Sequence, residues 1–143
     1  MKSFLLIIGL AFMLPAFAGD KAKVKFKKDR ILVDKVEWAS YSRAAGKFFM
    51  GVIGGEDFLS YSMESFVEGY HTNGQEKTES YLVVEFLMGD QKGEFEINVN
   101  RKQLVRLLVK EKVFENNTFS NEAAATFRKK YAQDISGRRF LTK

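Results

Sequence analysis

Residues 80–114 read SYLVVEFLMGDQKGEFEINVNRKQLVRLLVKEKVF, and this stretch decides the fold. Residues 81–88 form a dense apolar run rich in β-branched and aromatic side chains, and a turn with a glycine at each end follows. In residues 94–99, apolar side chains alternate with polar ones. These patterns are typical of a buried strand and a half-exposed strand. We therefore predict a β-hairpin on which the rest of the chain assembles.

A helix is expected directly after this hairpin. Asn100 is followed three residues later by Gln103 and then by the apolar run of residues 104–109. This spacing resembles a capping box, in which the two side chains satisfy backbone N–H groups at the start of a helix. Leucines and valine in residues 104–108 make a broad apolar stripe at the helical period, so we expect this face to pack on the sheet.

The chain before the hairpin carries further strand patterns separated by turns. Strands are predicted in residues 21–28, 31–33, 36–42, 47–53 and 59–67. Gly54-Gly55 fits a hairpin turn, because the G-x-x-x-x-G-K-[ST] pattern of a phosphate loop is missing. Residues 69–79 are the most polar uninterrupted stretch. They predict a loop of about eleven residues, a size that is often functional or mobile.

A second helix is expected after a polar break at residues 115–118. Ser120 is a good N-cap, and Gly137 is placed to end the helix as a C-cap. Phe127, Tyr131 and Ile135 share one face of this helix. About six strands followed by two helices predict the α+β class, with the helices packed on an antiparallel sheet. A strongly curled sheet, or a small barrel closed by the helices, is the structural alternative.

The first residues look like an export signal. Lys2 gives a positive start, residues 4–17 are nearly all apolar, and Ala16-Phe17-Ala18 is an A-x-A cleavage site. The apolar stretch is shorter than the ~20 residues of a spanning helix, although a retained anchor is the alternative. We predict a signal peptide at 1–18 that is removed after Ala18. Residues 19–143 then form a single α+β domain in the periplasm or outside the cell.

Composition narrows the environment of this domain. No second apolar stretch reaches spanning length, so we expect the mature chain to be soluble, with no membrane span. There are no cysteines, so a disulfide or a lipid-modified cysteine is impossible. An exported domain without disulfides depends on its core alone, which favours a bacterial export route.

The net charge of +5 is a moderate basic excess. Residues 21–28, KAKVKFKK, predict a strand with one basic face, in which lysines discourage edge-to-edge aggregation. Binding of an anionic lipid or polymer is the functional alternative. No aromatic side chain interleaves with the lysines on the same face, so we predict no specific nucleic-acid partner.

The sequence lacks the residues that most catalytic mechanisms require. There is no cysteine nucleophile, His71 is the only histidine, and no G-x-S-x-G elbow surrounds the serines of residues 60–65. A zinc site would need three carboxylates beside His71, and no calcium-loop motif is present. The sequence therefore predicts no catalytic, cofactor-binding or metal-binding residue, and no cofactor.

A carboxylate pair remains open as a catalytic alternative, because it needs only proximity in space. The glutamates in predicted strands are Glu37, Glu64, Glu85, Glu94 and Glu96. Glu85 stands out because it interrupts the apolar run of residues 81–88. A charge there lies either at a wet edge or beside a buried partner, and we favour this structural interpretation.

Several segments resemble a group of small exported bacterial proteins of unknown function. The resemblance lies in the hairpin, the helix NRKQLVRLLVKEKVF, the break ENNTFSNEAA and the ending FRKKYAQDIS, and the N-terminal KVKFKKDRILVDKVE is similar in style. It covers most of the mature chain and implies an exported domain with a strand-rich first part and two C-terminal helices. It implies no activity, ligand or site.

The prediction from sequence is a non-enzymatic exported domain that binds a protein or a small ligand. Two alternatives stay open: a carboxylate-based hydrolase, and an electrostatic binder of anionic lipid or polymer. The identity of the partner and the oligomeric state are not predicted.

Overall fold

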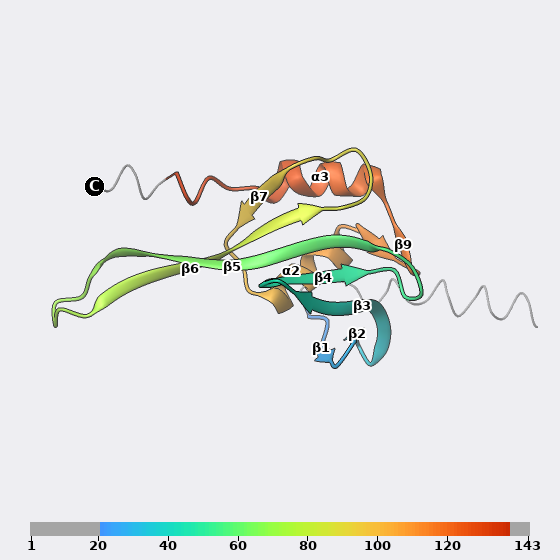
Figure 1. The fold of residues 1–143 in the computed structure, drawn as a ribbon, viewed down its shortest axis with the longest axis horizontal. Helices are drawn as coiled ribbons and strands as arrows, with labels where there is room; N and C mark the ends of the chain where they lie inside the picture. Colours follow the sequence, from blue (N-terminus) through green and yellow to red (C-terminus); the bar gives the residue numbers. More distant parts are fainter. Residues whose placement is uncertain (1–20, 138–143) are drawn as a thin grey trace, which may run out of the picture.

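The computed structural model describes residues 21–137, in which a curled antiparallel sheet of seven strands is followed by two helices (Figure 1). Strand order in the sheet equals chain order, so each strand pairs with the next one along the chain. The predicted α+β class and the curled sheet are therefore confirmed. The predicted signal peptide, residues 1–18, lies outside the described residues. Within the described part, no helix is long and apolar enough to cross a bilayer.

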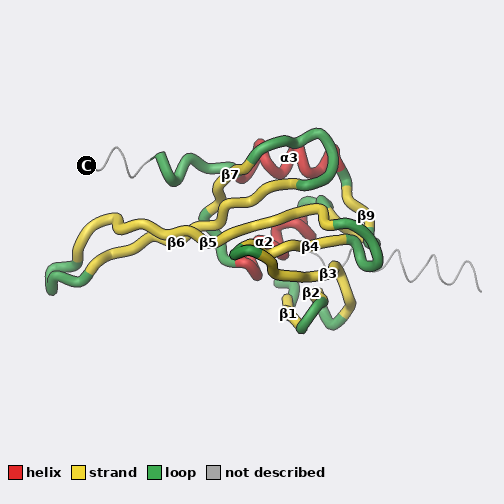
Figure 2. The backbone as a smooth tube through the Cα atoms, in the orientation of Figure 1, coloured by secondary structure: helices red, strands yellow, loops and turns green. Residues whose placement is uncertain are grey.

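The elements follow one another without long connections (Figure 2). The sheet contains β1 (Val24–Lys27), β2 (Arg30–Val33), β3 (Val36–Ala44), β4 (Lys47–Gly51), β5 (Asp57–Tyr70), β6 (Glu76–Phe86) and β7 (Glu94–Ile97). The remaining elements are α2 (Arg101–Lys110), the short strands β8 (Phe114–Glu115) and β9 (Thr118–Phe119), and α3 (Asn121–Tyr131).

The two helices pack on the inner face of the sheet. The strand register places Tyr61, Val84 and Phe95 side by side on this face, and all three are buried. From α3, Phe127 meets the Phe95 ring with a centroid distance of 6.3 Å. The apolar stripe predicted for α2 is buried at Leu104, Val105 and Leu108. Full burial of one such side chain contributes about 1.5–3 kcal/mol. The core therefore lies between the inner face of the sheet and the two helices.

Two bulges aim aromatic rings at the β8–β9 hairpin. In β3, Trp38 is the extra residue between two paired positions, and in β5 Phe58 is the extra residue. Bulges re-aim side chains, and here both rings turn toward Phe114 of β8. The Phe58 and Phe114 rings stack with centroids 4.2 Å apart, and the Trp38 indole N–H donates to the Phe114 carbonyl at 2.9 Å. The Trp38–Phe114 bond joins residues 76 positions apart in the chain.

The capping box predicted for α2 is present. The Asn100 side chain accepts a hydrogen bond from the backbone N–H of Gln103 at 2.8 Å, and the Gln103 side chain accepts from the Asn100 N–H at 2.9 Å. Two backbone N–H groups that a helix start leaves without partners are therefore satisfied. The capping box thus fixes the residue at which α2 begins after β7.

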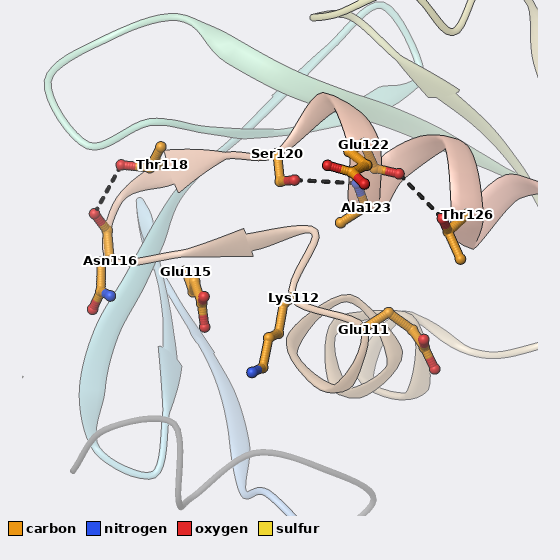
Figure 3. Close-up of a pocket in the computed structure, with 9 residues that line it drawn as sticks. All are labelled: Glu111, Lys112, Glu115, Asn116, Thr118, Ser120, Glu122, Ala123 and Thr126. Atoms are coloured by element: carbon orange, nitrogen blue, oxygen red, sulfur yellow. Dashed lines mark hydrogen bonds between the residues drawn. The ribbon is translucent and has the colours of Figure 1, made fainter. Parts of the chain in front are cut away.

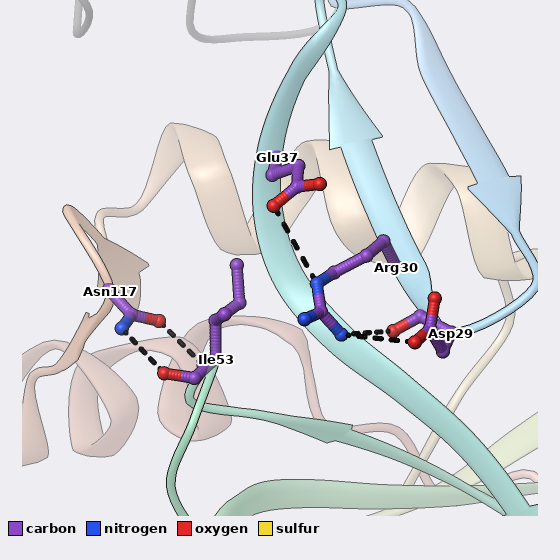
Figure 4. A network of polar contacts seen from close by, with 5 residues as sticks. All are labelled: Asp29, Arg30, Glu37, Ile53 and Asn117. Atoms are coloured by element: carbon purple, nitrogen blue, oxygen red, sulfur yellow. Dashed lines mark hydrogen bonds and ion pairs between the residues drawn. The ribbon is translucent and has the colours of Figure 1, made fainter.

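Two predictions near the C-terminus were wrong. Residues 115–118 are not a simple break but the β8–β9 hairpin, because Asn116 and Asn117 adopt positive φ angles of 51° and 58°. The Asn117 side chain also exchanges two hydrogen bonds with the backbone of Ile53, at 2.8 and 3.1 Å (Figure 4). These bonds hold the hairpin against the β4–β5 turn.

The second helix ends at Tyr131 rather than at Gly137. After it the chain is extended, and the Gln133 N–H donates to the Glu96 carbonyl at 2.8 Å. The Glu96 carboxylate accepts the N–H groups of Ile135 and Ser136 at 2.9 and 2.8 Å. Pairing with the edge of β7 thus replaces the last predicted helical turns, and Ile135 is buried from an extended segment.

The largest correction concerns residues 69–79, which were predicted to be a loop. Here β5 continues to Tyr70 and β6 begins at Glu76, so only a tight turn between them is not strand. The strands pair as far as Tyr70 and Glu76. Cross-strand pairing satisfies the backbone even though the side chains are polar.

We expect Trp38→Phe to lower the free energy of unfolding by about 1–3 kcal/mol, because the Phe114 carbonyl loses its donor. Denaturant unfolding followed by circular dichroism measures this change. Val36→Thr on the same strand is the matched control, since Val36 is 44% exposed, and its effect should stay within about 0.5 kcal/mol. Equal stabilities for Trp38→Phe and the parent chain would show that this contact does not hold the hairpin.

Candidate functional site

The far ends of β5 and β6 form an arm that extends beyond the other strands of the sheet (Figure 1). β4 pairs with β5 only as far as Tyr61, and β7 pairs with β6 only from Leu82. Residues 63–80, here called the arm, are therefore a two-stranded ribbon beyond the edge of the sheet. At the spacing of an antiparallel strand the arm extends roughly 25 Å. None of its residues is buried.

Large apolar side chains form a stripe along one face of the arm. Met63, Val67 and Tyr70 are 64%, 43% and 70% exposed, the three largest apolar exposures on the arm. Val67 pairs with Thr78 and Tyr70 with Glu76, while Glu68 is the extra residue of a bulge. Because residues two apart on β6 share a face, the bulge brings Tyr70 to the same face as Val67. We call these three residues the arm stripe.

The charges of the arm oppose those of the rest of the chain. The arm contains the glutamates Glu64, Glu68, Glu76 and Glu79 and one lysine, Lys77, a formal net charge of −3 in a chain of net charge +5. An isolated two-stranded ribbon is marginally stable in water. The arm therefore combines exposed apolar groups with an acidic charge on a ribbon that has no third strand.

The structure does not bring the predicted carboxylates into one site. Glu37 lies on β3, where Arg30 of β2 approaches it at 3.6 Å and also contacts Asp29 at 3.5 Å (Figure 4). Glu64 lies on the exposed arm. Neither side chain lines the groove that contains Glu94 and Glu96.

Glu85, Glu94 and Glu96 share the outer face of the sheet. Glu85 is half-buried between Ser60 and Glu94, which are its cross-strand neighbours, and Lys47 lies 3.9 Å from Glu94. Glu94 and Glu96 also line a groove of about 430 Å³ together with Asp134. The Glu96 carboxylate is occupied by the two backbone N–H groups described above, which gives it a structural role.

A second groove, of about 620 Å³, lies between the β8–β9 hairpin and the two helices (Figure 3). Glu111, Glu115 and Glu122 line it, and the Thr126 hydroxyl donates to the Glu122 carbonyl at 3.2 Å. Among the described residues, no group of three or more acidic, histidine or cysteine side chains is arranged to hold a metal ion. The groove therefore offers polar side chains without a metal-binding arrangement.

At one end of this groove, Glu111 binds two residues of α3. Its carboxylate accepts from the Lys130 ammonium at 2.9 Å and from the Tyr131 hydroxyl at 2.8 Å. These hydrogen bonds, with Lys130 first, lower the pKa of Glu111, and the same ion pair raises the pKa of Lys130. Burial and then the bond to Glu111 raise the pKa of Tyr131. The cluster ties the end of α2 to α3.

A tyrosine pair lies on the inner face where the arm begins. The Tyr41 and Tyr61 hydroxyls are 3.0 Å apart, and Arg101 donates to the Tyr41 hydroxyl at 3.4 Å. Burial, followed by the hydrogen bond with Tyr41, raises the pKa of Tyr61 well above its ordinary value. The Arg101 guanidinium also lies 4.2 Å from the centre of the Phe26 ring. A tyrosine held protonated in this way is a structural anchor and a poor base.

His71, the only histidine, is exposed in the turn at the tip of the arm. Its backbone N–H donates to the Gln75 carbonyl at 2.8 Å, which closes the turn. Figure 2 shows the turn between β5 and β6 at the far end of the ribbon, and His71 lies in this turn and lines neither groove.

Comparison with family models, curated proteins and solved structures finds no match to this chain. The strand predicted over residues 59–67 includes the first part of the arm, but its continuation was missed because residues 69–79 are polar. The alternation of Leu59, Tyr61 and Met63 with polar residues was the signal for the part that was predicted.

The Glu111 cluster predicts a specific response to acid. A carboxylate whose pKa is lowered on folding stabilises the fold above the ordinary glutamate value of 4.5, and this contribution is lost as the pH falls through the lowered pKa. We expect Glu111→Gln to remove that part of the acid dependence. Denaturant unfolding between about pH 7 and pH 3 measures the difference.

Glu115→Gln, in the same groove on β8, is the matched control because it removes one carboxylate without touching Lys130 or Tyr131. If the difference in stability between the parent chain and Glu111→Gln were the same at every pH, the carboxylate would not be stabilised by this cluster.

Proposed function

We propose that this protein is an exported, non-enzymatic interaction protein that binds another protein chain through its arm. The observation that carries the proposal is the arm stripe, which places Met63, Val67 and Tyr70 in water on a ribbon without a third strand. Leaving large apolar side chains in water costs free energy that a partner recovers by covering them. The export signal predicted at residues 1–18 supports the proposed location in the periplasm or outside the cell.

The partner surface that fits the arm is defined by its chemistry. From residue 62 onward β5 pairs only with β6, so its outer backbone groups can pair with an added strand. Addition of a strand to a free edge is a common mode of protein recognition, with side chains giving the specificity. The net charge of −3 on the arm favours a basic surface. The proposed partner is therefore a protein chain with a basic, unpaired strand edge.

A photo-crosslinking amino acid in place of Tyr70 tests this proposal in the cells that produce the protein. We expect a discrete protein adduct from position 70 and none from Lys102, an exposed control position on α2. Met63→Gln with Val67→Thr should reduce the adduct at least tenfold, because the apolar contact is weakened. Equal adducts from positions 70 and 102, or adducts insensitive to these changes, would contradict the proposal.

A hydrolase panel tests the non-enzymatic part of the proposal. Glu94 and Glu96 line the groove in which a carboxylate mechanism would be placed. Turnover by the purified protein that Glu94→Gln abolishes without loss of stability would establish an enzyme instead.

A further inference from the structure

We propose that the partner of the arm is a second copy of this chain, with the arm of one copy added to the β1 edge of the other. This inference rests on the proposed function, since it names the partner of the same arm. β1 is the first strand of the sheet, and among the described elements only β2 pairs with it.

The β1 edge has backbone groups that an added strand can pair with. The Lys23 carbonyl accepts from Asp34 at 2.8 Å and the Lys23 N–H donates to the Asp34 carboxylate at 3.0 Å, so the backbone of Lys23 faces β2. Because antiparallel strands alternate, the backbone N–H and C=O groups of Val24 and Phe26 face away from β2.

One outward group before β1 is already used. Arg106 of α2 donates to the carbonyl of Ala22 at 2.8 Å. No described residue forms a hydrogen bond with the outward groups of Val24 and Phe26. The structure therefore satisfies the edge up to Ala22 and leaves the next two outward positions available for a strand.

The charges on this edge complement those of the arm. Residues 21–28 contain five lysines and no acidic residue, a formal charge of +5. All five lysines are exposed, and within residues 21–137 none of them forms an ion pair. A segment of +5 and an arm of −3 attract each other, whereas two arms of −3 repel each other. The charges thus select arm-to-edge over arm-to-arm contact.

The same arrangement accounts for the two-stranded arm and for the lysines of the β1 edge. In a pair of copies, each arm adds to the edge of the other, so both contacts form about a two-fold axis. The arm gains the third strand that an isolated ribbon needs. The lysines of the edge, which discourage pairing with neutral strands, admit an acidic one.

Charge reversal with complementation tests this inference on the chain as the cell produces it. In the arm variant, Glu64, Glu68 and Glu76 each become Lys, which turns the arm from −3 to +3. In the edge variant, Lys23, Lys25 and Lys27 each become Glu, which turns residues 21–28 from +5 to −1. All six side chains are exposed, and circular dichroism checks that both variants fold.

Sedimentation at low salt should give the parent chain a mass above one copy, and each variant alone should associate at least tenfold more weakly. A one-to-one mixture of the two variants should restore association, because each reversed arm meets a reversed edge. Association of the parent should weaken at least tenfold at about 0.5 M salt, where charges are strongly screened. Lys102→Glu with Lys129→Glu, on exposed helix positions, should leave association unchanged.

A parent chain that stays monomeric at low salt would overturn this inference, as would a mixture that fails to restore association. A monomeric parent whose edge lysines bind heparin would assign that edge to an anionic polymer and would equally overturn it. An adduct from position 70 to a different protein would still support the proposed function. The two proposals therefore fail separately.

Discussion

The fold depends on the contact between the two bulged rings and Phe114. Trp38 and Phe58 come from different strands, and each bulge turns one ring into the space where Phe114 arrives from β8. The indole N–H bond to the Phe114 carbonyl fixes this approach in direction as well as in distance. Since β8 lies between α2 and α3 in the chain, the contact also positions both helices on the inner face.

The two helices cover only one part of the inner face of the sheet, and the arm extends beyond them. The covered part lies around Tyr61, Val84 and Phe95, which are buried. Burial ends where the arm begins. Beyond that point the same face carries Met63, Val67 and Tyr70 in water. The arm stripe is therefore the continuation of the core-facing side of the sheet past its helices. This continuity is the basis of the proposal that the arm is an interface.

Short-range signals in the sequence predicted much of this structure. The hairpin of residues 81–99 and the Asn100–Gln103 capping box depend on neighbours within a few residues, so spacing alone indicated them. The bulges at Trp38 and Phe58 depend on the register of partner strands, which a single sequence does not specify. The turn at Asn116 and Asn117 was open to prediction, because consecutive asparagines tolerate positive φ.

The candidate site was harder to predict than the fold. Residues 69–79 are polar, which indicated a loop. In the structure β5 and β6 stay paired beyond the core as far as Tyr70 and Glu76, so most of this segment is strand. The bulge at Glu68, which decides the side on which Tyr70 lies, has no local sequence signature. Glu85, the carboxylate singled out from the sequence, is half-buried on the outer face between Ser60 and Glu94. The acidic composition of the arm was visible in the sequence, but its meaning depended on knowing that the arm is a ribbon.

Amide hydrogen exchange tests most directly whether the arm is the unsupported part of a fold built for association. Opening without loss of the core gives fast exchange where few buried contacts hold the backbone. The account predicts fast exchange for residues 64–70 and 76–80 in dilute solution, with slow exchange for residues 58–61 and 82–86. It also predicts slower exchange of the arm as the protein concentration rises. Arm amides as protected as those of the core in dilute monomer, with no dependence on concentration, would contradict it.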